Sequence, residues 1–285
     1  MPLSFDILTI FPDMFTGVLG ESIVARALAS GILRVQFTNI RDFTTDRHRS
    51  VDDRPYGGGP GMIFKPEPVF AAVESVLARH DEPGGAEAGP GRLRKVLLTP
   101  QGKRLTQADL RGLASAARIV LLCGHYEGFD ERVVEGLAAG HGFEEISVGD
   151  YILSGGEIPA MVILEGVVRL LPGALGHPLS ARDESFEHGA LEFPQYTRPP
   201  EFRGMRVPDV LLSGNHQLIE KWRREESLRR TRERRGDLMA PLPGALPGAE
   251  PDAAGAGREG RAARRQSVEY GGRVGGAMEG CSSWT

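Results

Sequence analysis

Short apolar runs alternate with helix-like segments along the middle of the chain, and this alternation limits the fold more than any other feature. Each run is suited to a buried strand, and they lie at 95–99, 119–123 and 144–149. Helix candidates follow them at 106–117, 130–140 and 157–171. Strands that alternate with helices in this way predict an α/β domain with a largely parallel sheet.

The N-terminal part continues the same pattern. Strands are expected at 5–10 and 33–39, and helices at 12–31 and 67–80. Pro12 suits the first turn of the first helix, and Gly31 is a natural stop. Thr106 is expected to cap the helix at 106–117, with Asp109 at the third helical position.

Three glycine-bearing loops leave the expected strands, at 98–104, 123–132 and 149–157. In open α/β sheets, ligands bind where loops leave the carboxyl ends of strands. Glycine lets backbone amides and carbonyls approach a ligand closely. None of the loops has a Lys-Ser/Thr pair or a dense cluster of cations, which favours an adenine or another heterocycle over a polyphosphate. Each loop alone is an ordinary βα turn, and only their convergence at one edge favours a site.

A fourth glycine-rich stretch, "DDRPYGGGPGM" at 52–62, fits no familiar nucleotide loop. A Walker loop would end in Gly-Lys-Ser/Thr, and a Rossmann fingerprint would follow a strand directly and open a helix. Taken alone, such glycines are typical of a tight turn. The residues before them, 41–54, are densely charged, and a polar loop of this length inside a compact domain is uncommon unless it is functional.

Charge is distributed unevenly along the chain. The net charge is −4, yet residues 216–236 hold eight basic residues against four acidic ones. Such an asymmetry can mark an element that faces nucleic acid. On this segment alone, a solvated helix with Glu225–Arg229 and Glu226–Arg230 pairs is the better interpretation.

Several function classes are disfavoured by what the chain contains. Its two cysteines, Cys123 and Cys281, form no Cys-x-x-Cys pair, so neither a disulfide framework nor a thiolate zinc site is expected. The histidines show no metal-ligand spacing, and no Gly-x-Ser-x-Gly elbow occurs. No apolar stretch is long enough for a membrane helix and the N-terminus does not resemble a signal peptide, so a cytoplasmic location is expected.

Two carboxylates and an arginine near the middle of the chain have the residue types for proton transfer. Asp183 and Glu184 lie on an expected loop, and Arg169 lies near the end of the preceding helix. A base beside a cation could remove a proton from a heterocycle and stabilise the resulting charge. On the residues alone, Asp183 is more simply a turn or cap acid and Arg169 a surface residue.

Segments rich in Gly, Pro and Ala are expected to lack a packed core. The stretch 81–92 is interpreted as a flexible surface loop, and the tail 237–285 as disordered.

Seven motifs in a fixed order resemble those of the bacterial tRNA (guanine-N1)-methyltransferases, which belong to the SPOUT class. They are "VDDRPYGGGPGM" (51–62), "TPQG" (99–102), "CGHYEGFDERV" (123–133), "ISVGDYILSGGEIPAM" (146–161), "PGALGHP" (172–178), "YTRP" (196–199) and "VPDVLLSGNH" (207–216). The resemblance covers roughly residues 3–236. It implies a SPOUT-type parallel sheet with a deep trefoil knot and a small helical C-terminal domain. The implied divisions are a methyltransferase domain at 1–171, an interdomain linker at 172–191, a helical tRNA-binding domain at 192–236 and the tail at 237–285.

The same resemblance implies a binding site for the methyl donor S-adenosylmethionine in the knot. The residues carried over are Leu98, Thr99, Pro100, Gly124, Tyr126, Glu127, Val148, Gly149, Asp150, Tyr151, Ile152, Leu153 and Gly155. Arg54, Gly59, Pro60 and Gly61 are implied to approach the target guanine, which must leave the base stack.

Catalysis in that family requires a base, because guanine N1 carries a proton. The family places an aspartate directly before Ser-Phe, where this chain has "ARDESF". By register Glu184 takes the role, with Asp183 as the alternative. Arg169 matches the arginine that stabilises charge on O6, and Asp52 matches an acid contributed by the other subunit.

The resemblance further implies that the chain methylates N1 of the guanine 3′-adjacent to the anticodon and acts on tRNA as a homodimer with a shared active site. It leaves a requirement for Mg²⁺ open, and no resident metal site is expected. Two alternatives stay open: a catalytically impaired RNA-binding protein of the same fold, and a SPOUT enzyme that methylates the ribose 2′-hydroxyl. The tail at 237–285 departs from the helical continuation expected of the family.

Overall fold

The computed structural model describes residues 2–79, 92–175, 184–186 and 189–239. The loop predicted at 81–92 lies outside this part of the chain apart from Arg92. The tail predicted at 237–285 lies outside it from residue 240 onward, and so does Asp183.

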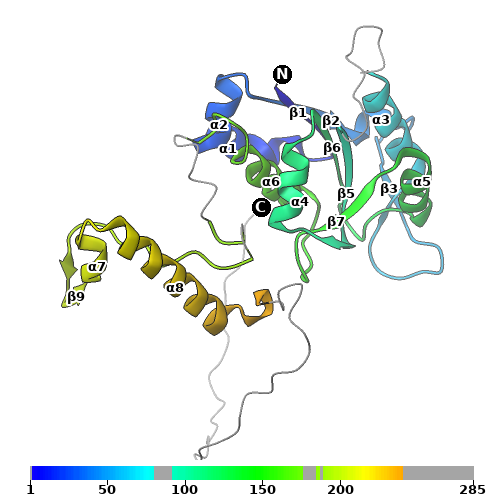
Figure 1. Cartoon of the computed structure of the whole chain (residues 1–285). Coiled ribbons are helices and arrows are strands. Elements are labelled where there is room, and N and C mark those ends of the chain that lie inside the picture. The colour runs from blue at the N-terminus through cyan, green and yellow to red at the C-terminus, as the bar shows by residue number, and fades with distance from the viewer. Residues whose placement is uncertain (1, 80–91, 176–183, 187–188, 240–285) are drawn as a thin grey trace, which may run out of the picture. The chain divides into compact units, whose positions relative to one another are not determined.

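A five-stranded parallel sheet forms the centre of the molecule, as the alternating pattern predicts (Figure 1). Its strand order is β2-β1-β6-β5-β7. The strands are β1 Leu3–Thr9, β2 Leu33–Asn39, β5 Leu93–Arg104, β6 Arg118–Cys123 and β7 Glu144–Ser147. Every residue of β6 is buried, because it lies between two other strands and under helices on both faces.

Helices cover both faces of the sheet and enclose two separate apolar clusters. One cluster joins the sheet to α2 (Ser22–Ala29), α4 (Gln107–Ala114) and α6 (Glu157–Val168). The other joins it to α3 (Pro66–Ala78) and α5 (Glu131–His141). This three-layer arrangement is the one expected of parallel sheets, whose strands are buried on both faces.

The capping prediction for α4 is confirmed. The Thr106 side chain accepts a hydrogen bond from the backbone N–H of Asp109, and the Asp109 carboxylate accepts one from the backbone N–H of Thr106. This reciprocal pair satisfies two backbone donors that a helix start leaves without partners.

The single helix predicted at 12–31 is wrong. The segment divides into η1 (Pro12–Phe15), α1 (Thr16–Gly20) and α2. The break falls at Glu21, which is extended, and at Ser22, which has a φ of 56°. Gly20 ends α1, and Gly31, with a φ of 71°, follows α2 as predicted.

The glycine-rich stretch 57–61 connects two short antiparallel strands, β3 (Asp52–Asp53) and β4 (Ile63–Phe64). The preceding charged segment begins in η2 (Ile40–Phe43).

The C-terminal part of the described chain is mostly helical. A short hairpin of β8 (Glu201–Phe202) and β9 (Met205–Arg206) precedes α7 (Asp209–Leu212), α8 (His216–Arg234) and η3 (Gly236–Leu238). Ion pairs at three- and four-residue spacing occur along α8, as predicted, but with other partners. Glu225 pairs with Lys221, and Glu226 pairs with Arg229.

Candidate functional site

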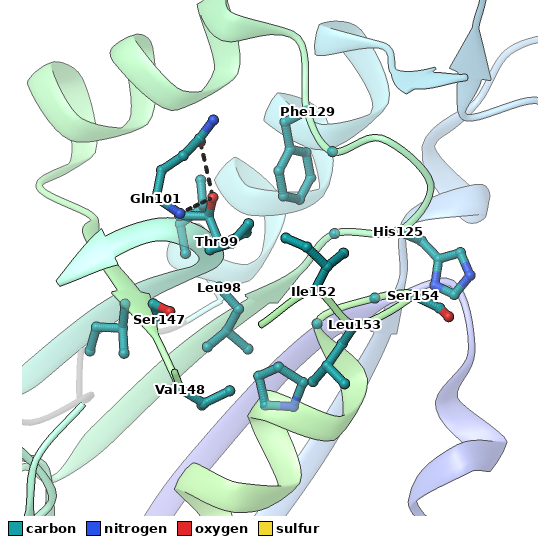
Figure 2. Close-up of a pocket in the computed structure, with 18 of the residues that line it drawn as sticks. Leu98, Thr99, Gln101, His125, Phe129, Ser147, Val148, Ile152, Leu153 and Ser154 are labelled. Carbon is teal, nitrogen blue, oxygen red and sulfur yellow. Dashed lines mark hydrogen bonds between the residues drawn. The ribbon is translucent and has the colours of Figure 1, made fainter. Parts of the chain in front are cut away.

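The three glycine-bearing loops converge on one cavity of about 330 Å³ at the carboxyl ends of β5, β6 and β7. Figure 2 shows side chains from all three loops around this space, among them Leu98, His125 and Leu153. The convergence predicted from the sequence is therefore confirmed. Cavities of this size hold small organic ligands.

Twelve of the thirteen residues predicted to bind the cofactor line the cavity: Leu98, Thr99, Pro100, Gly124, Tyr126, Glu127, Val148, Gly149, Tyr151, Ile152, Leu153 and Gly155. Asp150 does not. Its side chain is 88% exposed, and its carboxylate lies 3.7 Å from the guanidinium of Arg104. A tight turn, closed by a hydrogen bond from Tyr151 N–H to the carbonyl of Gly149, directs Asp150 away from the cavity.

The sequence interpretation missed other lining residues, including Gln101, His125, Phe129, Ser147, Ser154, Gly156 and Pro159. Gln101 donates its backbone N–H to the Thr99 hydroxyl at 3.4 Å, and its side-chain oxygen lies 3.1 Å from that hydroxyl (Figure 2). Five of these seven lie inside the three predicted loops, and that position was the available signal. Ser147 lies at the end of β7 and Pro159 in α6, outside those loops.

Gly102 marks the place where β5 leaves and rejoins the sheet. Both Leu98 and Lys103 pair with Ile146, so residues 99–102 bulge out between them to form one wall of the cavity. A Cβ atom at Gly102 would lie 2.5 Å from the backbone of Glu145 and Ile146. Only a glycine lets the bulge cross β7 this closely.

A buried carboxylate connects two of the cavity's loops to the sheet. Glu157, the first residue of α6, is almost fully buried and accepts a 2.7 Å hydrogen bond from the Thr9 hydroxyl. Its second oxygen lies 3.4 Å from Nδ1 of His125. Because His125 also forms a backbone bridge with Gly155, Glu157 connects β1 to two of the cavity's loops.

The glycine-rich stretch 57–61 lies beside this chain's own cavity. The backbone N–H of Glu127 donates to the carbonyl of Met62, and a Cβ atom at Gly61 would collide with the Glu127 side chain. These contacts are within one chain. Arg54, Gly59 and Pro60 are exposed near it, and Asp52 is half-buried on β3.

Arg169 and Glu184 form a bidentate ion pair. Both terminal nitrogens of Arg169 donate to the Glu184 carboxylate at 2.6 Å, and each side chain is about one-quarter exposed. The hydrogen bonds from Arg169 hold the pKa of Glu184 below its ordinary value, despite an opposing effect of burial. Glu184 is thus an anion at neutral pH.

This pair lies at the opposite end of α6 from the cavity. Pro159, in the first turn of α6, lines the cavity, and Arg169 caps the helix C-terminus. Ten residues of α-helix span about 15 Å along the axis. The cavity and the ion pair are therefore two separate parts within one chain.

Two further findings concern the described residues alone. They contain no group of three or more His, Cys, Asp or Glu side chains placed to hold a metal ion. None of their helices combines the length and apolarity needed to cross a bilayer.

The fold and the cavity define a parallel α/β protein with a glycine-lined ligand site at the carboxyl ends of its strands. The chain belongs to the tRNA (guanine-1)-methyltransferase TrmD family, whose pattern it matches over residues 3–241. Its curated relatives include three proteins named tRNA (guanine-N(1)-)-methyltransferase. The relative from Geobacillus kaustophilus is 54% identical over 85% of this chain and 93% of its own length. The relative from Gloeobacter violaceus is 54% identical over 84% of this chain and 99% of its own length. The relative from Moorella thermoacetica is 53% identical over 82% of this chain and 89% of its own length.

Substitution of Gly102 by alanine is expected to weaken binding of S-adenosylmethionine by about tenfold or more. The added methyl forces the bulge and β7 apart, and overpacking of this kind costs about 1–3 kcal/mol of stability. Calorimetric titration with the donor and a thermal melt measure the two effects. Gly112→Ala in α4 is the matched control, because its Cβ would meet only ordinary contact at 3.6 Å from the Arg94 side chain. Wild-type affinity in Gly102→Ala would show that the bulge does not form the donor site.

Proposed function

We propose that this protein transfers a methyl group from S-adenosylmethionine to N1 of the guanine 3′-adjacent to the anticodon of tRNA. Family membership over most of the chain supports the reaction. The observation that carries the proposal for this chain is the convergence of its three glycine-bearing loops on one cavity.

The cavity has the chemistry that an adenosyl ligand needs. Apolar side chains such as Leu98 and Ile152 offer a surface for the adenine ring, and the loop backbone offers donors and acceptors for its edge. We assign the twelve predicted lining residues to donor binding. Asp150 is left out, because it points away from the cavity toward Arg104.

We assign Glu184 as the general base and Arg169 as the group that stabilises charge on the guanine. Without RNA the two side chains neutralise each other through paired hydrogen bonds. The guanine edge presents an N1–H donor beside the O6 acceptor. It can therefore replace both bonds at once, with N1–H donating to Glu184 and O6 accepting from Arg169.

The proton of N1 then moves to the Glu184 carboxylate, and the electron pair of the N–H bond stays on N1 of the guanine. Arg169 stabilises the negative charge that develops on O6. S-adenosylmethionine supplies the electrophilic methyl group when bound; the N1–CH₃ bond forms as the S–CH₃ bond breaks, and that electron pair stays on sulfur. This step needs N1 within about 3–3.5 Å of the methyl carbon.

The distance along α6 supports a site shared between two subunits. Within one chain, Arg169 and Glu184 are separated from the cavity by most of that helix, so the pair of one subunit would serve the cavity of its partner in a homodimer. Ile158 and Val162, one turn apart on α6, are each 46% exposed and give that helix an apolar face. A two-fold dimer would bury such a face against its own copy.

We propose that the stretch 52–62 approaches the guanine at the cavity of its own chain, with Asp52, Arg54, Gly59, Pro60 and Gly61 as the contributing residues. The contact between Gly61 and Glu127 supports this position. The proposal includes a SPOUT-type knot and domain boundaries at residues 171, 191 and 236. It also includes tRNA as the substrate and a cytoplasmic location.

The test is a methyl-transfer assay with labelled donor and identification of the modified nucleoside. A tRNA with Gly-Gly on the 3′ side of its anticodon is expected to yield N1-methylguanosine, and the same tRNA with that guanine replaced is expected to stay unlabelled. A ribose 2′-O-methyl product would overturn the proposal in favour of another RNA methyltransferase. Donor binding without turnover would favour a non-catalytic RNA-binding protein.

A further inference from the structure

We infer that Ser227 and Thr231 of α8 are positioning residues for the catalytic carboxylate, an inference that rests on the proposed role of Glu184. Thr231 is a polar residue with no exposed surface, on a helix that is otherwise highly charged. Ser227 lies four residues before it, and residues at this spacing share one face of a helix. Ser227 is half-buried, and the buried hydroxyl of Thr231 requires hydrogen-bond partners.

Both hydroxyls bind the backbone of a single residue, Leu191. The backbone N–H of Leu191 donates to Oγ1 of Thr231 at 2.9 Å, and Oγ of Ser227 donates to the Leu191 carbonyl at 2.6 Å. Thr231 in turn donates to the carbonyl of Ser227 at 2.7 Å. The two side chains thus form hydrogen bonds with both the backbone N–H and the carbonyl of Leu191, as a neighbouring β-strand would.

The next residue extends this contact to the catalytic segment. The backbone N–H of Glu192 donates to Oγ of Ser185 at 3.0 Å, and its carbonyl accepts from Arg230 at 3.2 Å. The backbone N–H of Phe186 donates to the carbonyl of Ala190 at 2.8 Å. A continuous series of bonds therefore leads from α8 through Leu191 and Glu192 to Ser185, the immediate neighbour of Glu184.

Glu184 is consequently held from two directions. Arg169, at the end of α6, binds its carboxylate, and α8 fixes its backbone through Ser185. When guanine replaces the bond to Arg169, the connection to α8 still holds the backbone beside the carboxylate in place. The position of α8 then sets the position of the base, and α8 carries the excess of basic residues suited to RNA phosphates.

Thr231→Val tests the inference, because valine keeps the shape and removes both hydrogen bonds. A carboxylate displaced by about 1 Å can lose about 100-fold in rate. We expect kcat to fall about 10- to 100-fold, with KM for tRNA and affinity for the donor within about twofold of wild type. Thr231→Ser restores the hydroxyl and is expected to recover turnover. If Thr231→Val does not fold, Ser227→Ala removes one bond only and takes its place in the same assay.

A double-mutant cycle separates positioning from a general loss of structure. In a Glu184→Gln background there is no base left to position, so Thr231→Val is expected to cause little further loss of kcat. The inference would be overturned if the losses of kcat in the two single variants multiplied in the double variant. It would also be overturned if Thr231→Val raised KM for tRNA and left kcat unchanged. Normal turnover by Glu184→Gln would show that the proposed base is wrong. Impaired turnover by Glu184→Gln together with normal turnover by Thr231→Val would show that only the positioning role is wrong.

Discussion

Glu184→Gln is expected to lower kcat for tRNA methylation by about 100-fold or more. Glutamine keeps the shape of the side chain and one oxygen that can accept a hydrogen bond from Arg169, but it cannot take the proton of guanine N1. Single-turnover methyl transfer with saturating donor measures the effect. Donor affinity is expected to stay at the wild-type value, because the cavity lies at the other end of α6.

Asp183→Asn is the informative comparison, since the sequence places two adjacent carboxylates before Ser185. The bidentate pair with Arg169 involves Glu184, so Asp183→Asn is expected to retain most of the turnover. A large loss in Asp183→Asn together with a small loss in Glu184→Gln would transfer the role to Asp183.

The pH dependence checks the same assignment. The base must be an anion, and the hydrogen bonds from Arg169 hold the pKa of Glu184 below its ordinary value. Acidification should therefore reduce kcat/KM only below the ordinary range of a glutamate. In Arg169→Ala the pKa of Glu184 rises toward its ordinary range. The fall of kcat/KM on acidification should therefore begin at a higher pH than in wild type.

The cavity was largely predictable from the sequence, because local signals determine it. Strand ends are recognisable from apolar runs, parallel strands direct their carboxyl ends to one edge, and the glycines there allow close backbone approach. The structure brings 98–104, 123–132 and 149–157 together as these rules predict. The one predicted residue that does not line the cavity has a local explanation: the turn at Gly149 directs Asp150 away, and residue spacing does not reveal that turn.

The break between α1 and α2 and the pairing on α8 were less predictable. Gly20 was a signal for the break, but the apolar periodicity continued across it and favoured one helix. On α8 each glutamate has more than one cation at three- or four-residue spacing, so side-chain rotamers decide which pair forms.

The ion pair of Arg169 with Glu184 and the bonds of Ser227 and Thr231 to Leu191 are tertiary contacts. Composition and periodicity carry no information about which segment meets which. The resemblance to a known family supplied the roles of Arg169 and Glu184, whereas Ser227 and Thr231 looked like ordinary polar positions of a solvated helix. Their hydrogen bonds to the backbone of Leu191 distinguish them, together with the burial of Thr231.

A heterodimer of two impaired variants, assayed with the donor well below its Kd for Gly102→Ala, is expected to recover about half of the wild-type activity, because a two-fold dimer with shared sites would then contain one intact site out of two. One subunit carries Gly102→Ala and binds the donor about tenfold or more weakly, and the other carries Glu184→Gln and lacks the base. If each cavity uses the ion pair of the partner subunit, one site combines both defects and the other combines none. The physical reason is the separation along α6 of Pro159 from Arg169, which leaves the two halves of the chemistry apart within one chain.

The measurement is methyl transfer by heterodimers purified through two different affinity tags, beside the two homodimeric variants purified in the same way. Each homodimer is expected to retain about one-tenth of the wild-type activity or less at this donor concentration, since both of its sites are impaired in one function. Heterodimer activity no higher than that of the homodimers would mean that cavity and base act within one subunit. Glu184 would then have to reach the cavity of its own chain, and the ion pair with Arg169 would have to open completely before the guanine could bind.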